Sequence, residues 1–188
     1  TISYNVSDAA SNAATEVTRT VTVVDNIPPV ISLVGDASVN INLEQPYMDQ
    51  GATATDNIDG DISEQIVTTG IVDALTPGSY TISYDVADAA GNQATTVTRT
   101  VVVIDNISPS ISLVGDMSKI VYLDQAYTDE GATATDNVDG NLTDQIVTTG
   151  TVDTSTPGSY TIRYNVSDAA GNSAPEVTRT VTVIDNVN

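Results

Sequence analysis

The chain repeats itself at an interval of 80 residues, and this periodicity constrains its fold more than any other feature of the sequence. The segment 81–84 recurs at 161–164 with one substitution and appears first at 1–4. When residues 25–104 are aligned on 105–184, no insertion is needed and roughly two thirds of the positions are identical. The sequence is therefore a piece of an array of similar modules.

The repeat predicts the domain organisation. We expect residues 25–104 and 105–184 to be two complete modules, and residues 185–188 to begin the next linker. Residues 1–24 match the end of a module and are too few to bury a core of their own. We expect them to be the C-terminal strands of a preceding repeat. They would be completed within a longer protein or, alternatively, by strands of another chain.

Each module has the residue pattern of an all-β fold. Valine, isoleucine and threonine dominate, and Phe and Trp are absent. Apolar and polar residues alternate over 80–87, which indicates a half-buried strand, and 97–104 predicts a second long strand. Further strands are predicted at 47–55 and 62–70. About seven short strands per module, separated by turn residues, predict tandem β-sandwiches.

The first strand of each module is ambiguous. Segments 30–34 and 39–43 are both apolar and are separated by Gly35 and Asp36. We interpret them as one edge strand that kinks and changes sheet. The alternative is a pair of separate antiparallel strands.

Composition and charge exclude several classes of function. The net charge of −20 makes nucleic acid an improbable partner, and no apolar run approaches the length of a membrane span. Cysteine and histidine are absent, and no lysine recurs between the modules, so a nucleophile–base pair is not expected. We therefore do not expect an enzyme.

An acidic turn at 55–61, Thr-Asp-Asn-Ile-Asp-Gly-Asp, returns at 135–141 with Asn141 in place of Asp61. So many carboxylates in one turn repel each other unless a cation lies among them. The chain has only five Lys and Arg residues against 25 Asp and Glu, so a bound Ca²⁺ is the natural candidate.

The fold decides which acidic residues meet. If the edge segments form one strand, the linker, the acidic turn and the loop at 88–92 share one end of the sandwich. If they form two strands, the turn at 56–61 lies at the opposite end, beside Asp105. The candidate metal ligands are Asp25, Asn26, Asp56, Asn57, Asp59, Asp61, Asp88 and Asn92, with their equivalents Asp105, Asn106, Asp136, Asn137, Asp139, Asn141, Asp168 and Asn172.

The same residues have a simpler interpretation. Asp, Asn and Gly are ordinary turn residues, and their side chains accept hydrogen bonds from nearby backbone amides without any metal. Replacement of Asp61 by Asn141 means either that one carboxylate is not required or that the second site is weaker.

Arg19, Arg99 and Arg179 recur in the last strand of each module, on the same alternation as its valines. One interpretation is a clamp for a carboxylate. We favour the other, in which the arginine lies at the rim and its aliphatic stem covers the core.

The combined motifs resemble a known family. Asp-Asn-x-x-Pro, Gly-Ala-Thr-Ala-Thr-Asp-Asn-x-Asp-Gly, Pro-Gly-Ser-Tyr-Thr-Ile and Asp-Ala-Ala-Gly-Asn are similar to the immunoglobulin-like repeats of large bacterial surface proteins and adhesins, and to hyalin-type repeats. The resemblance implies immunoglobulin-like sandwiches and a modular extracellular role at the bacterial cell surface.

The function that we predict is a structural spacer. Stiff modules, with calcium at their junctions, would carry another domain away from the cell or build a fibre with other copies. A surface glycan or protein would then be bound by that other domain. The alternative is a carbohydrate- or protein-binding module, for which Tyr47, Tyr122 and Tyr127 are the candidate aromatic platforms.

Overall fold

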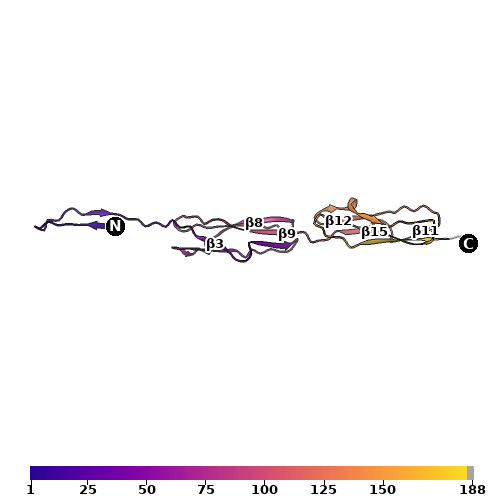
Figure 1. Ribbon diagram of the computed structural model, residues 1–188, viewed down its shortest axis with the longest axis horizontal. Coiled ribbons are helices and arrows are strands. Elements are labelled where there is room, and N and C mark those ends of the chain that lie inside the picture. The colour runs from indigo at the N-terminus through magenta and orange to yellow at the C-terminus, as the bar shows by residue number, and fades with distance from the viewer. Residues whose placement is uncertain (186–188) are drawn as a thin grey trace. The chain divides into compact units, whose positions relative to one another are not determined.

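The computed structural model describes residues 1–185 and confirms the all-β prediction (Figure 1). Within that range the only helical elements are two 3-10 turns, η1 (Ser63–Gln65) and η2 (Thr143–Gln145). The expected start of a further linker falls largely on residues 186–188, which lie outside the described residues.

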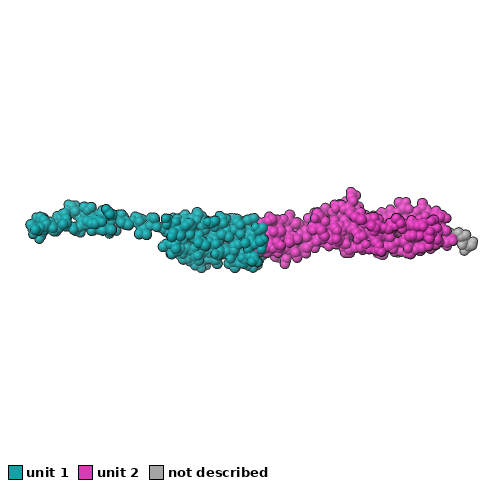
Figure 2. Space-filling view, viewed as in Figure 1, with its two compact units in different colours: residues 1–38, 48–71, 81–100 teal, residues 39–47, 72–80, 101–188 magenta. Residues whose placement is uncertain are grey.

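Contacts divide the chain into two compact units, coloured separately in Figure 2. The first comprises residues 1–38, 48–71 and 81–100, and the second comprises 39–47, 72–80 and the chain from 101 onward. The second unit therefore contains the whole of the second repeat.

The N-terminal segment forms a two-stranded antiparallel pair, β1 (Ile2–Tyr4) with β2 (Val17–Arg19). Its apolar side chains are exposed, for example Tyr4 at 50% and Val17 at 64%. These strands bury no core among themselves, in agreement with the prediction for so short a segment.

Each repeat contains a three-stranded and a four-stranded sheet. In the first repeat the sheets are β3-β5-β6 and β4-β9-β8-β7, and in the second they are β10-β12-β13 and β11-β16-β15-β14. The strands of the first repeat are β3 (Val30–Leu33), β4 (Ser38–Asn42), β5 (Ala52–Asp56), β6 (Gly60–Asp61), β7 (Val67–Thr69), β8 (Gly78–Asp85) and β9 (Val97–Ile104). Those of the second are β10 (Ser110–Leu113), β11 (Ser118–Tyr122), β12 (Ala132–Asp136), β13 (Gly140–Asn141), β14 (Val147–Thr149), β15 (Gly158–Asn165) and β16 (Val177–Ile184).

The first strand of each repeat kinks and changes sheet, as predicted. In the second repeat β10 pairs antiparallel with β12, whereas β11 pairs parallel with β16 in the other sheet. The kink lies at Gly115, whose φ is +81°. The positive φ favours glycine, whereas the only atoms near an added side chain belong to the flexible carboxylate end of Glu130, which could move aside.

Two strand predictions were too long. Residues 47–51 are irregular, because the Asp49 carboxylate accepts the Gly51 N–H at 2.9 Å and Gly51 has a φ of +78°. The segment predicted as a strand from residue 62 begins with η1, and the Ser63 hydroxyl accepts the N–H of Ala54 at 2.9 Å. Side-chain hydrogen bonds to the backbone thus replace strand pairing at both places.

The core of the second repeat lies between its two sheets. Ile162, Tyr164 and Val181 are at most 4% exposed and form one cluster with Val121. At the opposite end of β15, the Tyr160 hydroxyl donates to the carbonyl of Thr156 at 2.8 Å, the tyrosine-corner contact of sandwich domains.

Candidate cation site

The linker supplies the first carboxylate of the site. Asp25 precedes β3, and its Oδ1 atom accepts the N–H of Ile27 at 3.1 Å. Asp105 and Ile107 make the same contact at 3.1 Å in the second repeat. One oxygen of each linker carboxylate therefore fixes the backbone, and the other oxygen is available for a ligand.

The acidic turn supplies the second carboxylate. Asp56 Oδ1 accepts the N–H groups of Ile58 and Asp59 at 2.8 and 3.0 Å, and Gly60 completes the turn with a φ of +76°. The hydrogen bonds from Asp59 and Ile58 lower the pKa of the Asp56 carboxyl, so this group is ionised at neutral pH.

The loop after β8 supplies the third carboxylate. Asp88 Oδ1 accepts the N–H of Asn92 at 2.7 Å, and its Oδ2 accepts the side-chain amide of Asn92 at 2.6 Å. The same amide also donates to the backbone carbonyl of Asp25 at 3.4 Å. In the N-terminal segment, Asp8 likewise accepts hydrogen bonds from the backbone N–H and the side-chain amide of Asn12. The loop therefore forms from its own residues, without the rest of a sandwich.

The three carboxylates converge in each repeat. Asp25, Asp56 and Asp88 each offer an oxygen within 4.8 Å of the others, and so do Asp105, Asp136 and Asp168. Asp88, Asp105 and Asp168 are at most 8% exposed. The Oδ2 atoms of Asp56 and Asp136 are buried and have no hydrogen-bond partner. An unpaired buried carboxylate oxygen is costly unless a cation compensates it.

The basic residues of the chain are mostly engaged elsewhere. Arg99 and Arg179 pair with Asp49 and Asp129, Arg163 with Glu176, and Lys119 with Asp116 and Glu130. The carboxylate clusters thus lack an obvious internal counter-ion. In the second cluster, burial raises the pKa of Asp168, but hydrogen bonds from Asn172 and the loop backbone outweigh it and leave that pKa below the ordinary value.

The structure places the other predicted residues around the cluster. Asp59 Oδ2 accepts the N–H of Ala89 at 2.8 Å, and Asp139 accepts that of Ala169 at 2.7 Å, which ties the turn to the loop. Asp61 accepts the Ser63 N–H at 3.0 Å, as Asn141 accepts the Thr143 N–H. An amide oxygen serves this contact as well as a carboxylate, which explains the substitution. The exposed members are Asn26, Asn57, Asp59, Asp61, Asn106, Asn137 and Asn141.

The convergence agrees with the first of the two predicted arrangements. The edge segments act as one strand that changes sheet, so the linker, the turn and the loop meet at the end where the chain enters each sandwich. We call this the entrance end.

The interpretation of the recurring arginines was wrong for the two complete repeats. Arg99 and Arg179 are at most 1% exposed and pair with the carboxylates of Asp49 and Asp129. They are carboxylate clamps rather than rim residues. Arg19, in the N-terminal segment, is exposed.

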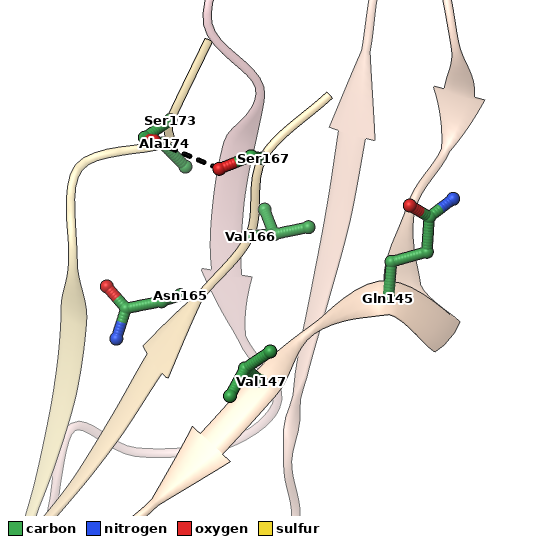
Figure 3. Close-up of a pocket in the computed structure, with 7 residues that line it drawn as sticks. All are labelled: Gln145, Val147, Asn165, Val166, Ser167, Ser173 and Ala174. Atoms are coloured by element: carbon green, nitrogen blue, oxygen red, sulfur yellow. Dashed lines mark hydrogen bonds between the residues drawn. The ribbon is translucent and has the colours of Figure 1, made fainter. Parts of the chain in front are cut away.

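A hollow lies beside the short edge strand of the second repeat (Figure 3), and a similar hollow lies at the same place in the first repeat. It is lined by Gln145, Val147, Asn165, Val166, Ser167, Ser173 and Ala174 in the second repeat, and by Gln65, Val67, Asp85, Val86, Ala87 and Gln93 in the first. Ser167 and Ser173 bond to each other at 2.9 Å, whereas their equivalents are Ala87 and Gln93. The shape repeats while the chemistry does not, so the hollow follows from the fold.

Comparison with known proteins decides the family. The family described as "Bacterial surface protein, Ig-like domain" has a sequence model that matches residues 31–103 and 111–183, one match in each repeat. The chain belongs to this family. Its two matched domains are tandem immunoglobulin-like repeats of a bacterial surface protein type, and no helix within the described residues is long and apolar enough to cross a membrane.

Relatives among curated proteins include repeat proteins of other organisms. The chain is 28% identical to hyalin of Strongylocentrotus purpuratus and 30% identical to hyalin of Lytechinus variegatus, in each case over 97% of its length. It spans only 16% and 36% of those two proteins. The predicted resemblance to hyalin repeats is therefore confirmed, and it involves only a part of each hyalin.

Solved structures give weaker likenesses. The lipoprotein BT2262 from Bacteroides thetaiotaomicron is 21% identical, with 74% of this chain and 56% of that chain covered and a TM-score of 0.38. A Clostridium perfringens ZmpB structure containing the M60 catalytic domain with CBM51-1 and CBM51-2 is 14% identical, with 99% and 34% covered and a TM-score of 0.37.

Proposed function

We propose that this chain is part of an extracellular spacer at the bacterial surface, in which a Ca²⁺ ion at each entrance end fixes the linker to the sandwich that follows. It would act as a structural element of an adhesin or fibre and not as an enzyme. Its immediate partners would be neighbouring repeats of the same protein, and a terminal domain would contact a surface glycan or protein.

The observation that carries this proposal is the meeting of three carboxylates from three separate segments. Asp25 comes from the linker, Asp56 from the turn and Asp88 from the loop, and their equivalents converge in the second repeat. Ordinary turn chemistry accounts for Oδ1 of Asp25 and Asp56. It does not account for the buried, unpaired Oδ2 of Asp56.

The donor set suits a hard divalent cation. Calcium takes oxygen ligands at about 2.3–2.6 Å, so two oxygens on opposite sides of the ion lie about 5 Å apart. Oxygens within 4.8 Å of one another meet that limit. Three carboxylates also outweigh the charge of one Ca²⁺, which favours binding. We expect a modest affinity of about 10⁻⁴–10⁻³ M, as in other extracellular modules.

Calcium would act on the linker because one ligand belongs to it. Asp25 is followed closely by Pro28 and Pro29, which restrict the backbone. With the ion bound, the Asp25 carboxylate would be held by the same centre as the turn and the loop. The direction in which each linker enters the sandwich that follows it would then be constant along an array.

The binding-module alternative finds less support. Of its three candidate aromatic platforms, Tyr47 and Tyr127 are half-buried, and the Tyr127 hydroxyl donates to Asp129 at 3.0 Å. Tyr122 is 42% exposed, but the equivalent residue in the first repeat is Asn42, which has no aromatic ring. A platform present in one repeat does not explain the array.

Titration calorimetry with CaCl₂ tests the proposal. We expect two calcium ions per chain and a melting temperature that falls when a chelator is added, because binding to the folded state stabilises it by mass action. Absence of calcium binding, with melting unchanged by the chelator, would leave only the turn-capping interpretation of these residues.

A further inference from the structure

Arg179 connects the last strand of the second repeat to the first. It lies in β16 and is fully buried. Its guanidinium donates to the carbonyls of Val114 and Asp116, the second at 3.0 Å, and to that of Gly131 at 3.3 Å. It also pairs with the Asp129 carboxylate. One side chain therefore binds several acceptors outside its own strand.

Two of these acceptors lie at the point where the first strand changes sheet. Val114 and Asp116 flank Gly115, and their carbonyls lie between β10 and β11, where strand pairing is interrupted. Without the guanidinium, these carbonyls at a partly buried kink would lose their donor, which is costly where water cannot replace it. The planar fork of arginine matches several acceptors at once, whereas lysine offers a point charge.

The carboxylate of Asp129 fixes the guanidinium in turn. The Tyr164 hydroxyl donates to Asp129 Oδ2 at 2.6 Å, and Arg179 lies over the Tyr164 ring with 5.9 Å between the guanidinium carbon and the ring centroid. The arginine is thus held from both sides and has little freedom to follow a moving strand.

The strand order determines how this cluster responds to tension. β11 and β16 are parallel neighbours, in register from Ser118 with Thr180 to Tyr122 with Ile184. Pulling on the two ends of the repeat draws β10 and β11 toward the entrance end and draws β16 in the opposite direction. Hydrogen bonds between the two strands then bear load together, in shear, rather than opening one at a time.

We propose that Arg179, and Arg99 in the first repeat, is a load-bearing clamp that joins the first and last segments of its sandwich under tension. This inference rests on the proposed spacer function for its biological meaning, because a spacer transmits force along the chain. Arg99 makes the corresponding contacts with Val34, Asp36, Gly51 and Asp49. Both copies thus carry the same link.

Force spectroscopy on the full chain, tethered at its two ends, tests the clamp. The unaltered chain should show two similar unfolding events, one for each complete repeat. In Arg179→Lys one event should shift to lower force while the other stays, so that the first repeat serves as an internal reference. Asp129→Asn, a milder change, should produce the same shift to a smaller extent.

Leu142→Ala is the matched control, because Leu142 is 2% exposed and packs in a separate core cluster with Ala134 and Val166. Its loss of stability in urea should be compared with that of Arg179→Lys. The clamp is supported if Arg179→Lys lowers the unfolding force more than Leu142→Ala does, while the two variants lose a similar free energy of unfolding in urea. It is overturned if these two variants lower the unfolding force equally, or if neither Arg179→Lys nor Asp129→Asn lowers it.

The measurement is independent of the cation. Arg179 and Asp129 are not members of the carboxylate cluster, so the force difference should persist in chelator. If calcium fails to bind, the spacer proposal loses its junction mechanism while the clamp remains testable. If the clamp fails, calcium binding is unaffected.

Discussion

The carboxylate of Asp59 accepts a hydrogen bond from the backbone N–H of Ala89 at 2.8 Å, although the two residues are 30 positions apart. Asp139 and Ala169 repeat the contact at 2.7 Å. This contact fixes the acidic turn beside the loop without using a metal. It holds the carboxylates of Asp56 and Asp88 close together, so the candidate cation site is organised by the hydrogen bonds of the chain itself.

The first prediction follows from that contact. Asp59→Ala should weaken calcium binding to the first site by about tenfold, because supporting contacts around a metal site typically matter by that factor. Asp59→Asn keeps an acceptor for the Ala89 N–H and should restore most of the affinity. Calorimetry of the two variants separates the roles. If Asn binds calcium as weakly as Ala, the charge of Asp59 matters rather than its hydrogen bond.

The second prediction concerns the cluster itself. Asp56→Asn keeps an oxygen for the turn amides but replaces the unpaired oxygen with an N–H donor, so the variant should bind one calcium ion instead of two. Asp61→Asn is the control, since the second repeat carries Asn141 at this position. It should retain both sites. Equal stoichiometry in the two variants would contradict the assignment of Asp56 as a ligand.

The third prediction concerns pH. Burial raises the pKa of Asp129, but hydrogen bonds from Tyr164 and Arg179 outweigh it and hold that pKa below its ordinary value of 3.8. A carboxyl with a lowered pKa in the folded state stabilises the protein above its ordinary pKa, and this contribution is lost as the pH falls through the lowered pKa.

Asp129→Asn removes that contribution. Urea unfolding should show the variant to be less stable by about 2–3 kcal/mol at neutral pH, which is somewhat less than the roughly 3–5 kcal/mol for a broken buried pair, because Asp129 is partly exposed. The gap to the unaltered chain should narrow progressively below about pH 4. A gap that stays constant down to pH 2 would show that ionisation of Asp129 does not contribute.

Much of the fold was predictable because the signals were local. Alternating residues in β8 and valine-rich β9 indicated strands directly, and the 80-residue period defined the repeats. Residues 47–51 were predicted as the first part of a strand over 47–55. Their backbone instead follows the hydrogen bond from the Gly51 N–H to Asp49, whose other carboxylate oxygen pairs with Arg99, and the pattern of apolar residues shows neither contact.

The arginine clamp was considered from the sequence but not favoured, for a different reason. Arginine is rarely buried, so the alternation of Arg99 with valines was interpreted as a rim position. A signal was available in the segment 41–50, which differs strongly from 121–130. Tyr47 and Asp49 are among the few residues that both copies keep there, and Asp49 is the partner of the arginine.

The convergence of the carboxylates was predictable in part. Linker, turn and loop were expected to meet once the edge segments were treated as one strand, and Asp25, Asp56 and Asp88 do meet. Sequence alone could not separate Asp56 from Asp61, because both lie in the same acidic turn. The distinction depends on side-chain direction, since Asp61 bonds to Ser63 in its own turn.

The central claim is that a cation bound at the second site holds the linker between the two complete repeats in one direction. Small-angle X-ray scattering of the full chain, in calcium and in chelator, tests it most directly, with Asp136→Asn as the control. Removing calcium should broaden the distance distribution and change the maximum dimension of the unaltered chain, because repulsion among Asp105, Asp136 and Asp168 acts within the screening length of about 8–10 Å. The control should show a smaller response to calcium, because only its first site, at Asp25, Asp56 and Asp88, remains. Identical scattering of the unaltered chain in the two conditions would contradict the claim and leave the linker prolines and packing as the source of any stiffness.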